Sequence, residues 1–131
     1  MASSSFKSEY IAGPLGIKYD DHEQSIDIQL VVPGIKRPGI FGKGNTSVDA
    51  KFEDESLRIL IEIFDKGKKS VEGAKPKDTR LFEVKQLPGK ILTDLCHYTL
   101  KTDKCVVVLH KAAPGSWEHT LHQHGLDISG K

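Results

Sequence analysis

The stretch LRILIEIF, residues 57–64, places an aliphatic side chain at every second position. These residues are Leu57, Ile59, Ile61 and Ile63. A period of two is typical of a β-strand, because successive side chains of a strand point to opposite faces. Leu60 and Phe64 add apolar bulk to the other face. We therefore expect this strand to lie in the centre of a sheet, with a neighbour on each side.

Strand patterns recur along the rest of the chain. They occur in SIDIQLVV (25–32), TSVDAKFE (46–53), RLFEVKQL (80–87), ILTDLCHYTL (91–100) and CVVVLHK (105–111), and a seventh strand is expected over GIKYD (16–20). Pro-Gly pairs end two of these segments, since proline donates no hydrogen bond to a ladder. No segment keeps helical spacing for three turns. Short strands separated by turn residues predict an all-β, antiparallel sandwich of seven strands.

The chain has the length of one domain, 131 residues. We expect a flexible N-terminal segment over 1–15, the folded domain over 16–120 and a flexible C-terminal tail over 121–131. Residues 65–79 are rich in lysine and glycine and are expected to form a long hairpin loop.

Charge and hydropathy exclude several classes of protein. Nineteen basic residues nearly balance eighteen acidic ones, and a net charge of +1 gives no electrostatic case for nucleic acid. No stretch approaches the roughly 20 apolar residues of a membrane span, and the N-terminus has no apolar core of signal-peptide length. We therefore predict no membrane partner and a cytoplasmic address, with the nucleus as a second one. The two cysteines are expected to be reduced there.

The last two predicted strands form a hairpin whose register can be worked out. A two-residue turn at 102–103 pairs Lys101 with Lys104. The same register places Cys96 opposite Leu109, four pairs further along the ladder. At about 3.3 Å per residue, Cys96 then lies about 13 Å from Cys105 along the strands. This distance is too long for a disulfide.

Histidines offer two candidate metal sites. The hairpin register places His97 opposite Val108 and His110 opposite Leu95, so the two imidazoles lie diagonally on one face. We expect these to be ordinary exposed side chains. The segment HTLHQH contains His119, His122 and His124, a spacing that could hold zinc. Because no cysteine or carboxylate is paired with them locally, we predict no metal site and no cofactor.

A catalytic constellation is not found either. The glycine-rich segment 38–47 lacks the Gly-x4-Gly-Lys-Ser/Thr spacing of a phosphate loop and runs into a strand, not a helix. No motif frames a serine or cysteine nucleophile. We predict that the protein is not an enzyme.

The segment LFEVKQLPGKILTDLCHYTLKTDKCVVVLHKAAPGSWEHTL (81–121) combines three features in order. It has F-x-V on one strand, KTD before the last strand, and VVVLHK followed by the single tryptophan. This order resembles the CS domain, a module of small cochaperones of the ninety-kilodalton heat-shock chaperone, of nuclear distribution protein C and of calcyclin-binding protein. The chain is most similar to the last of these, the Siah-interacting protein, over about residues 16–120.

The resemblance has departures. CS domains often carry Y-x-W in the first strand, where this chain has IKYDD with Tyr19 in its place. The helical N-terminal and disordered C-terminal regions through which calcyclin-binding proteins bind Siah and calcium sensors are not present, so these partnerships are not carried over. The chain is expected to be either the middle domain of a longer protein or a minimal CS protein.

The resemblance implies a CS and small-heat-shock-like sandwich that acts as a docking platform. In the family, one exposed sheet face and its loops bind the chaperone, and the matching positions here are Lys18, Tyr19, Tyr98, Lys101, Asp103 and Lys111. Trp117 is expected to pack over the sandwich edge, or to anchor an interface, with the first favoured. The implied partner is the ninety-kilodalton chaperone or a ubiquitin-ligase component, bound by a monomer or weak dimer.

A second hypothesis is a holdase of the small heat-shock class that assembles with itself. The tripeptide LDI (126–128) resembles the Ile-x-Ile tail that such proteins dock into a neighbour's groove. The Gly-x-Leu signature expected before their last strand is missing. A mass measurement separates the two hypotheses, because a holdase is expected to form a large oligomer.

Overall fold

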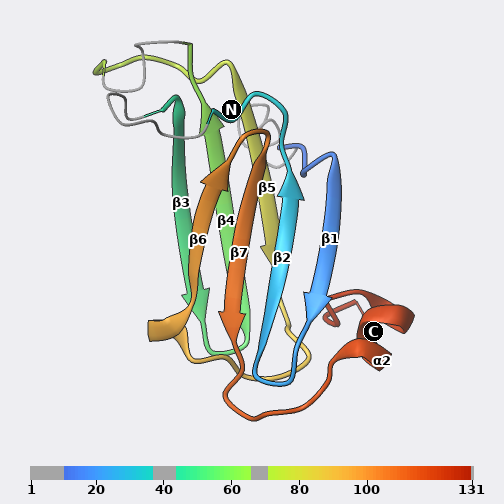
Figure 1. The fold of residues 1–131 in the computed structure, drawn as a ribbon. Helices are drawn as coiled ribbons and strands as arrows, with labels where there is room; N and C mark the ends of the chain where they lie inside the picture. Colours follow the sequence, from blue (N-terminus) through green and yellow to red (C-terminus); the bar gives the residue numbers. More distant parts are fainter. Residues whose placement is uncertain (1–10, 37–43, 66–70, 131) are drawn as a thin grey trace, which may run out of the picture.

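The computed structural model describes residues 11–36, 44–65 and 71–130, which form two antiparallel sheets packed face to face (Figure 1). The strands are β1 (Gly16–Asp21), β2 (Ser25–Val31), β3 (Thr46–Glu53), β4 (Ser56–Ile63), β5 (Asp78–Val84), β6 (His97–Lys101) and β7 (Lys104–His110). Their order is β1-β2-β7-β6 in one sheet and β3-β4-β5 in the other. The predicted seven-strand sandwich is confirmed.

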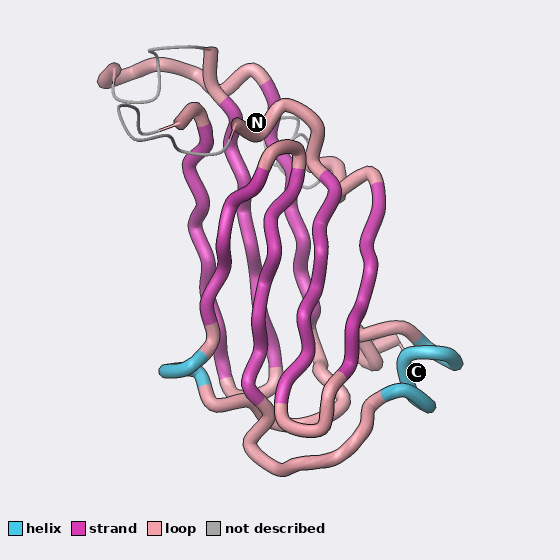
Figure 2. Tube along the Cα trace, viewed as in Figure 1, coloured by secondary structure: helices cyan, strands magenta, loops and turns pink. Residues whose placement is uncertain are grey.

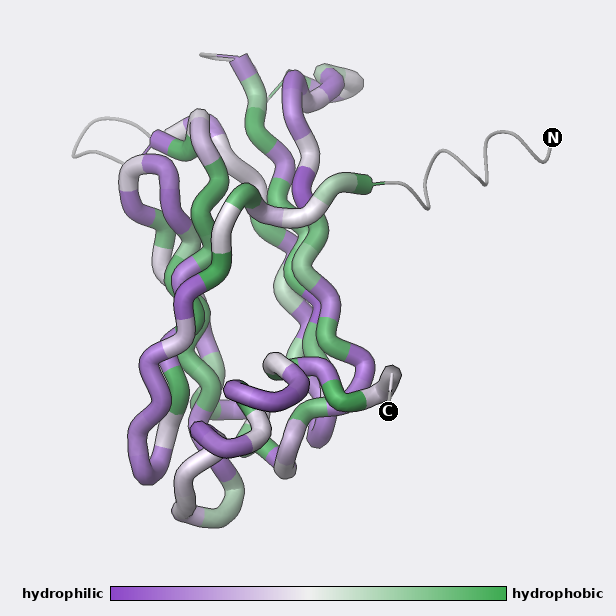
Figure 3. The backbone as a smooth tube through the Cα atoms, turned by 90° about the vertical axis from the view of Figure 1, so that its right-hand side faces the viewer, coloured by the Kyte–Doolittle hydropathy of each residue, from purple (hydrophilic) through white to green (hydrophobic). Residues whose placement is uncertain are grey.

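The core lies between the two sheets and is built from the aliphatic positions of the alternating strands. Figure 3 views the two layers from the side and shows apolar and polar residues alternating along them. Strand β4 supplies Leu57, Ile59, Ile61 and Ile63, each 2% exposed or less, and lies between β3 and β5 as predicted. Strands β2 and β7 face it with their own buried residues, Ile26, Ile28, Leu30, Cys105, Val107 and Leu109.

The predicted register of the last hairpin is confirmed near its turn. Lys101 pairs with Lys104 and Leu100 with Cys105. Both cysteines are free, and burial raises the pKa of the Cys105 thiol to about 12, so it stays protonated.

The prediction of a strand over 91–100 is wrong for the first half of this segment. Ile91 makes a single bridge to Lys111, a 3-10 helix η1 (Thr93–Leu95) follows, and β6 begins only at His97. The pairs expected for Cys96 and His110 therefore do not form. The chain crosses here from one sheet to the other, and the amide of Ile91 is bound by the Asp54 carbonyl of the opposite sheet.

The segment expected as a C-terminal tail packs on the sandwich instead. It forms helix α2 (Glu118–His124), which lies beside the lower end of β1 (Figure 2). Leu126 follows the helix and is buried in the core with 2% exposure. The Asp127 carboxylate accepts hydrogen bonds from the backbone amides of Lys85 and Gln86, just after β5. The C-terminal segment therefore connects the end of β5, at the edge of the three-stranded sheet, to β1, at the edge of the four-stranded sheet.

The N-terminal side of the domain is held in a similar way. The carbonyl of Ala12 accepts from the Leu81 amide on β5, and the Leu15 amide donates to Val31 on β2. Residues 1–10, most of the glycine-rich segment 38–47 and residues 66–70 of the predicted 65–79 loop lie outside the described residues. No helix in the described part of the chain is long and apolar enough to cross a membrane.

Candidate functional site

The side of the four-stranded sheet that faces away from the core is the broadest surface that the strands expose, and it is turned toward the viewer in Figure 1. Because directly opposite residues share a face, the buried positions of β2 and β7 fix which side chains point outward. We call this set the outer face: Lys18, Asp20, Asp27, Gln29, Val31, His97, Thr99, Lys101, Lys104, Val106, Val108 and His110.

The centre of the outer face is apolar. Val106 and Val108 are half-buried on β7, and Val31 on β2 is 36% exposed. Val106 lies opposite Gln29 and diagonal to Val31. A patch of β-branched side chains in mid-sheet, with polar residues around it, has the composition that interfaces show, an apolar centre with a polar rim.

The upper end of the outer face is positively charged. Lys101 and Lys104 are directly opposite each other across the β6–β7 ladder. Lys18 lies lower, on the edge strand β1, level with Gln29 and Val106. Like charges directly opposite destabilise a sheet. Among the described residues, no carboxylate lies within ion-pair distance of these three ammonium groups. The structure thus brings Lys18 and Lys101, two of the predicted site residues, to one face with their charges unpaired.

The two predicted tyrosines lie on the opposite side of the same sheet. Tyr19 pairs with buried Ile28, and Tyr98 pairs with buried Val107, so both rings point toward the core side at the two edges. Desolvation raises the pKa of Tyr19, and a hydrogen bond with the backbone of Leu126 partly offsets this. Tyr98 is 38% exposed because β6 is an edge strand. The expected grouping of the tyrosines with the lysines is therefore not what the structure shows.

Asp103 holds a turn. Its backbone has a positive φ of 59°, and its carboxylate accepts a hydrogen bond from the Gly34 amide at 2.9 Å. Its own amide donates to Ile35, and its carbonyl accepts from Val32. The β6–β7 turn is thereby fixed to the chain that leaves β2, beside the lysines of the outer face.

Lys111 differs most from its expected role, because its side chain is fully buried. Its ammonium meets the Asp21 carboxylate at 2.8 Å and donates to the carbonyls of His22 and Gly115. Desolvation by itself raises the pKa of Asp21, but hydrogen bonds from Lys111, the Trp117 amide and Ser116 outweigh it and lower the pKa. A partner has no access to this ammonium, which joins the first and last strands.

Trp117 covers the buried ion pair. The Lys111 nitrogen lies 5.0 Å from the ring centroid, within the range of a cation–π contact. The ring packs so closely on Gly89 that an added Cβ there would lie 3.3 Å from it. Trp117 is half-buried against the core, which agrees with the edge-packing role that was favoured for it.

The predicted histidine pair comes together on the outer face, with ring centroids of His97 and His110 6.3 Å apart. A further cluster, formed by Asp20, His22 and Asp27, lies at the turn between β1 and β2 and was not among the predicted sites. The available signal was the alternation of both strands, but the cluster depends on the exact register, which pairs Asp20 with Asp27. Among the described residues, Asp20, His22 and Asp27 form the group of three potential ligands whose ligand atoms lie close enough together to bind one metal ion.

Comparisons with known proteins bear on the fold. No protein-family model and no curated protein matches this chain. Among solved structures, it is similar to heat shock protein 16.0 from Schizosaccharomyces pombe, with 20% identity and a TM-score of 0.50 over 77% of this chain and 91% of that one. At this identity the likeness shows the fold alone, and it confirms a β-sandwich of the small heat-shock type.

Proposed function

We propose that this chain is a non-catalytic protein-interaction domain of the cochaperone or scaffold type, and that the outer face binds its protein partner. The observation that carries the proposal is the valine centre of this face beside three lysines that form no ion pair with any residue the structure describes. The CS-like order of motifs and the small-heat-shock type of sandwich support the same class of protein. Membership of the CS family and a cytoplasmic address are parts of this proposal.

The charge of the face indicates the chemistry of the partner. Lys101 and Lys104 repel each other in the free domain, so a partner carboxylate placed between them gains two attractions and relieves one repulsion. The partner surface is therefore acidic, with an apolar group to cover Val106. The CS resemblance implies the ninety-kilodalton heat-shock chaperone as first candidate and a ubiquitin-ligase component as second.

Charge reversal on the outer face tests the proposal. The double variant Lys101→Glu/Lys104→Glu is titrated with the chaperone, in the presence of an ATP analogue, and followed by fluorescence anisotropy. We expect a Kd at least tenfold weaker than that of the unchanged domain. Lys51→Glu is the matched control, because Lys51 is an exposed strand lysine on the other sheet, and its affinity is expected to stay the same.

Circular dichroism of both variants establishes that they remain folded. Equal affinity of the double variant and the unchanged domain would contradict the assignment of the face. If the unchanged domain does not bind the chaperone, that partner is excluded and the same variants are tested against ligase components.

A further inference from the structure

We propose that Asp20, His22 and Asp27 bind a divalent transition-metal ion of the zinc class. The three residues lie at the turn between β1 and β2, at the opposite end of the outer face from Lys101 and Lys104, and Lys18 precedes Asp20 by two residues on the same face of β1. This inference is independent of the proposed protein partner.

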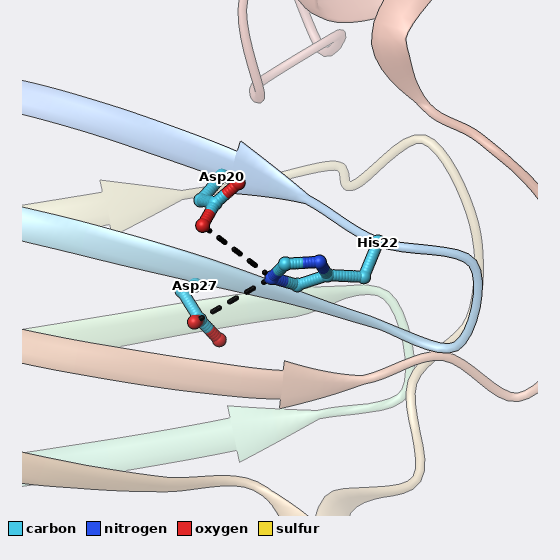
Figure 4. A group of neighbouring side chains, drawn as sticks. All are labelled: Asp20, His22 and Asp27. Carbon is cyan, nitrogen blue, oxygen red and sulfur yellow. Dashed lines mark ion pairs between the residues drawn. The ribbon is translucent and has the colours of Figure 1, made fainter.

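The spacing of the ligand atoms carries the proposal. His22 Nε2 lies 3.5 Å from Asp20 Oδ2 and 3.7 Å from Asp27 Oδ2 (Figure 4). Each of the three residues offers a ligand atom within 4.8 Å of those of the other two. Zinc binds nitrogen and carboxylate oxygen at about 2.0–2.2 Å, so two ligands of a tetrahedral ion lie roughly 3.3–3.6 Å apart. The two nitrogen–oxygen distances match this spacing to within a few tenths of an ångström, and the two carboxylate oxygens, which lie within 4.8 Å of each other, approach by up to about 1.5 Å when they bind the same ion.

The backbone holds these ligands in place. Asp20 and Asp27 are directly opposite in the β1–β2 ladder, which fixes the separation of their Cα atoms. The His22 amide donates to the Ser25 carbonyl at 2.8 Å, and the His22 carbonyl accepts from the buried Lys111 ammonium at 2.6 Å. A site whose ligands sit on rigid elements loses little conformational freedom when the ion binds.

The charge of the cluster favours a cation. Two carboxylates directly opposite each other in a ladder repel, and a bound dication removes that repulsion. The side chains of Asp20, His22 and Asp27 are 64%, 49% and 38% exposed, so an ion reaches them from solvent. His110 lies on the same face, diagonal to Asp27, and water is expected to fill the remaining coordination position.

The donor set selects the class of metal. Calcium takes six to eight oxygen ligands, and magnesium prefers oxygen ligands and keeps much of its water. An imidazole nitrogen with two carboxylates suits zinc and its neighbours among the later transition metals. We therefore expect zinc to bind more tightly than calcium or magnesium.

The test is calorimetric titration of the full chain with zinc chloride at pH 7.5. The unchanged protein is expected to bind one ion at this site, and His22→Gln and Asp27→Asn are each expected to weaken binding at least tenfold. His119→Gln/His122→Gln is the control, because these helix α2 histidines lie outside the cluster, and it is expected to keep full affinity. Amide and histidine-ring NMR signals of residues 20–27 are expected to shift on zinc addition.

Three results would overturn the proposal. They are no binding at 1 mM zinc, unchanged affinity in His22→Gln, or loss of binding in the α2 control variant. Because both cluster variants change exposed side chains, they are expected to fold, and their amide spectra verify it. Calcium binding tighter than zinc would contradict the class of metal.

Discussion

Lys111 shows how a single side chain can join the two ends of a sandwich. Its side chain is 0% exposed, and the side chain of its partner Asp21 is 11% exposed. Burying two charges costs several kcal/mol per ion, which the short pairing and the added carbonyl and amide hydrogen bonds offset. Removal of one partner leaves the other charge buried without its counterion.

Lys111→Met is therefore expected to lower the free energy of unfolding by about 3–5 kcal/mol, measured by urea denaturation. Methionine keeps the length of the side chain, so the loss reports on the charge and its hydrogen bonds. Lys104→Met, at the start of β7, is the control, and at its exposed position we expect a change within about 0.5 kcal/mol. Equal losses in the two variants would contradict the role of Lys111.

Asp21 makes the stability depend on pH. Its pKa in the folded protein is below the ordinary value of 3.8, so the unfolded chain takes up the proton at higher pH than the folded one. The contribution of Asp21 is complete above about pH 5 and is lost as the pH falls through the folded pKa. At pH values under about 4.5, the free energy of unfolding of the unchanged protein is thus expected to decrease as the pH is lowered.

Asp21→Asn removes this part of the pH dependence. The variant is less stable at pH 7 and is expected to lose less stability between about pH 5 and 3, in urea denaturation at each pH. Asp127 is expected to contribute to the pH dependence that remains in this variant. Hydrogen bonds from Ser129, Lys85 and Gln86 outweigh the desolvation of Asp127 and lower its pKa. A slope in Asp21→Asn equal to that of the unchanged protein would count against the pairing.

The C-terminal segment completes the edge of the sandwich between β1 and β5. Leu126→Ala removes a side chain that is 2% exposed and leaves a cavity, which costs about 2–5 kcal/mol. Leu95→Ala is the matched control, because Leu95 is 52% exposed and its loss is expected to change stability by no more than about 0.5 kcal/mol. Thermal unfolding of both variants checks this, and similar melting temperatures would show that the segment does not belong to the folded core.

The strands were predictable because their period-two pattern is local. In β4, the alternation of Leu57 to Ile63 identifies the buried face of the strand even when the neighbouring strands are unknown. The region before His97 was not predictable, since the chain crosses between sheets there and its hydrogen bonds go to Asp54 on the other sheet. Leu126 was missed for the same reason, because a single apolar residue after a short helix has no period.

The candidate site was predictable only in part. Lys18 and Lys101 were placed on one face by a resemblance, and the register of β1, β2, β7 and β6 brings them there. Lys111 has the sequence context of an exposed strand end, and its burial depends on Asp21 from a strand 90 residues away. The pairing of Asp20 with Asp27 likewise required the register of two strands.

The two edge strands of the four-stranded sheet, β1 and β6, indicate how the whole molecule assembles. β1 carries Lys18 and Asp20, and β6 carries Lys101, so charged side chains oppose edge-to-edge pairing. The LDI tripeptide is used within its own domain, where Leu126 is buried and the Ile128 amide donates to Gln86. We predict a monomer or weak dimer of the 14.5 kDa chain in sedimentation equilibrium. A large oligomer would favour the holdase hypothesis instead.

We propose that the outer face of the four-stranded sheet binds a protein partner. The most direct measurement is an amide NMR titration of the labelled domain with the ninety-kilodalton chaperone, with and without an ATP analogue. We expect shifts at Lys18, at residues 29–31 and at residues 99–106, and none in β3, β4 and β5. Shifts confined to the three-stranded sheet, with none on the outer face, would contradict it.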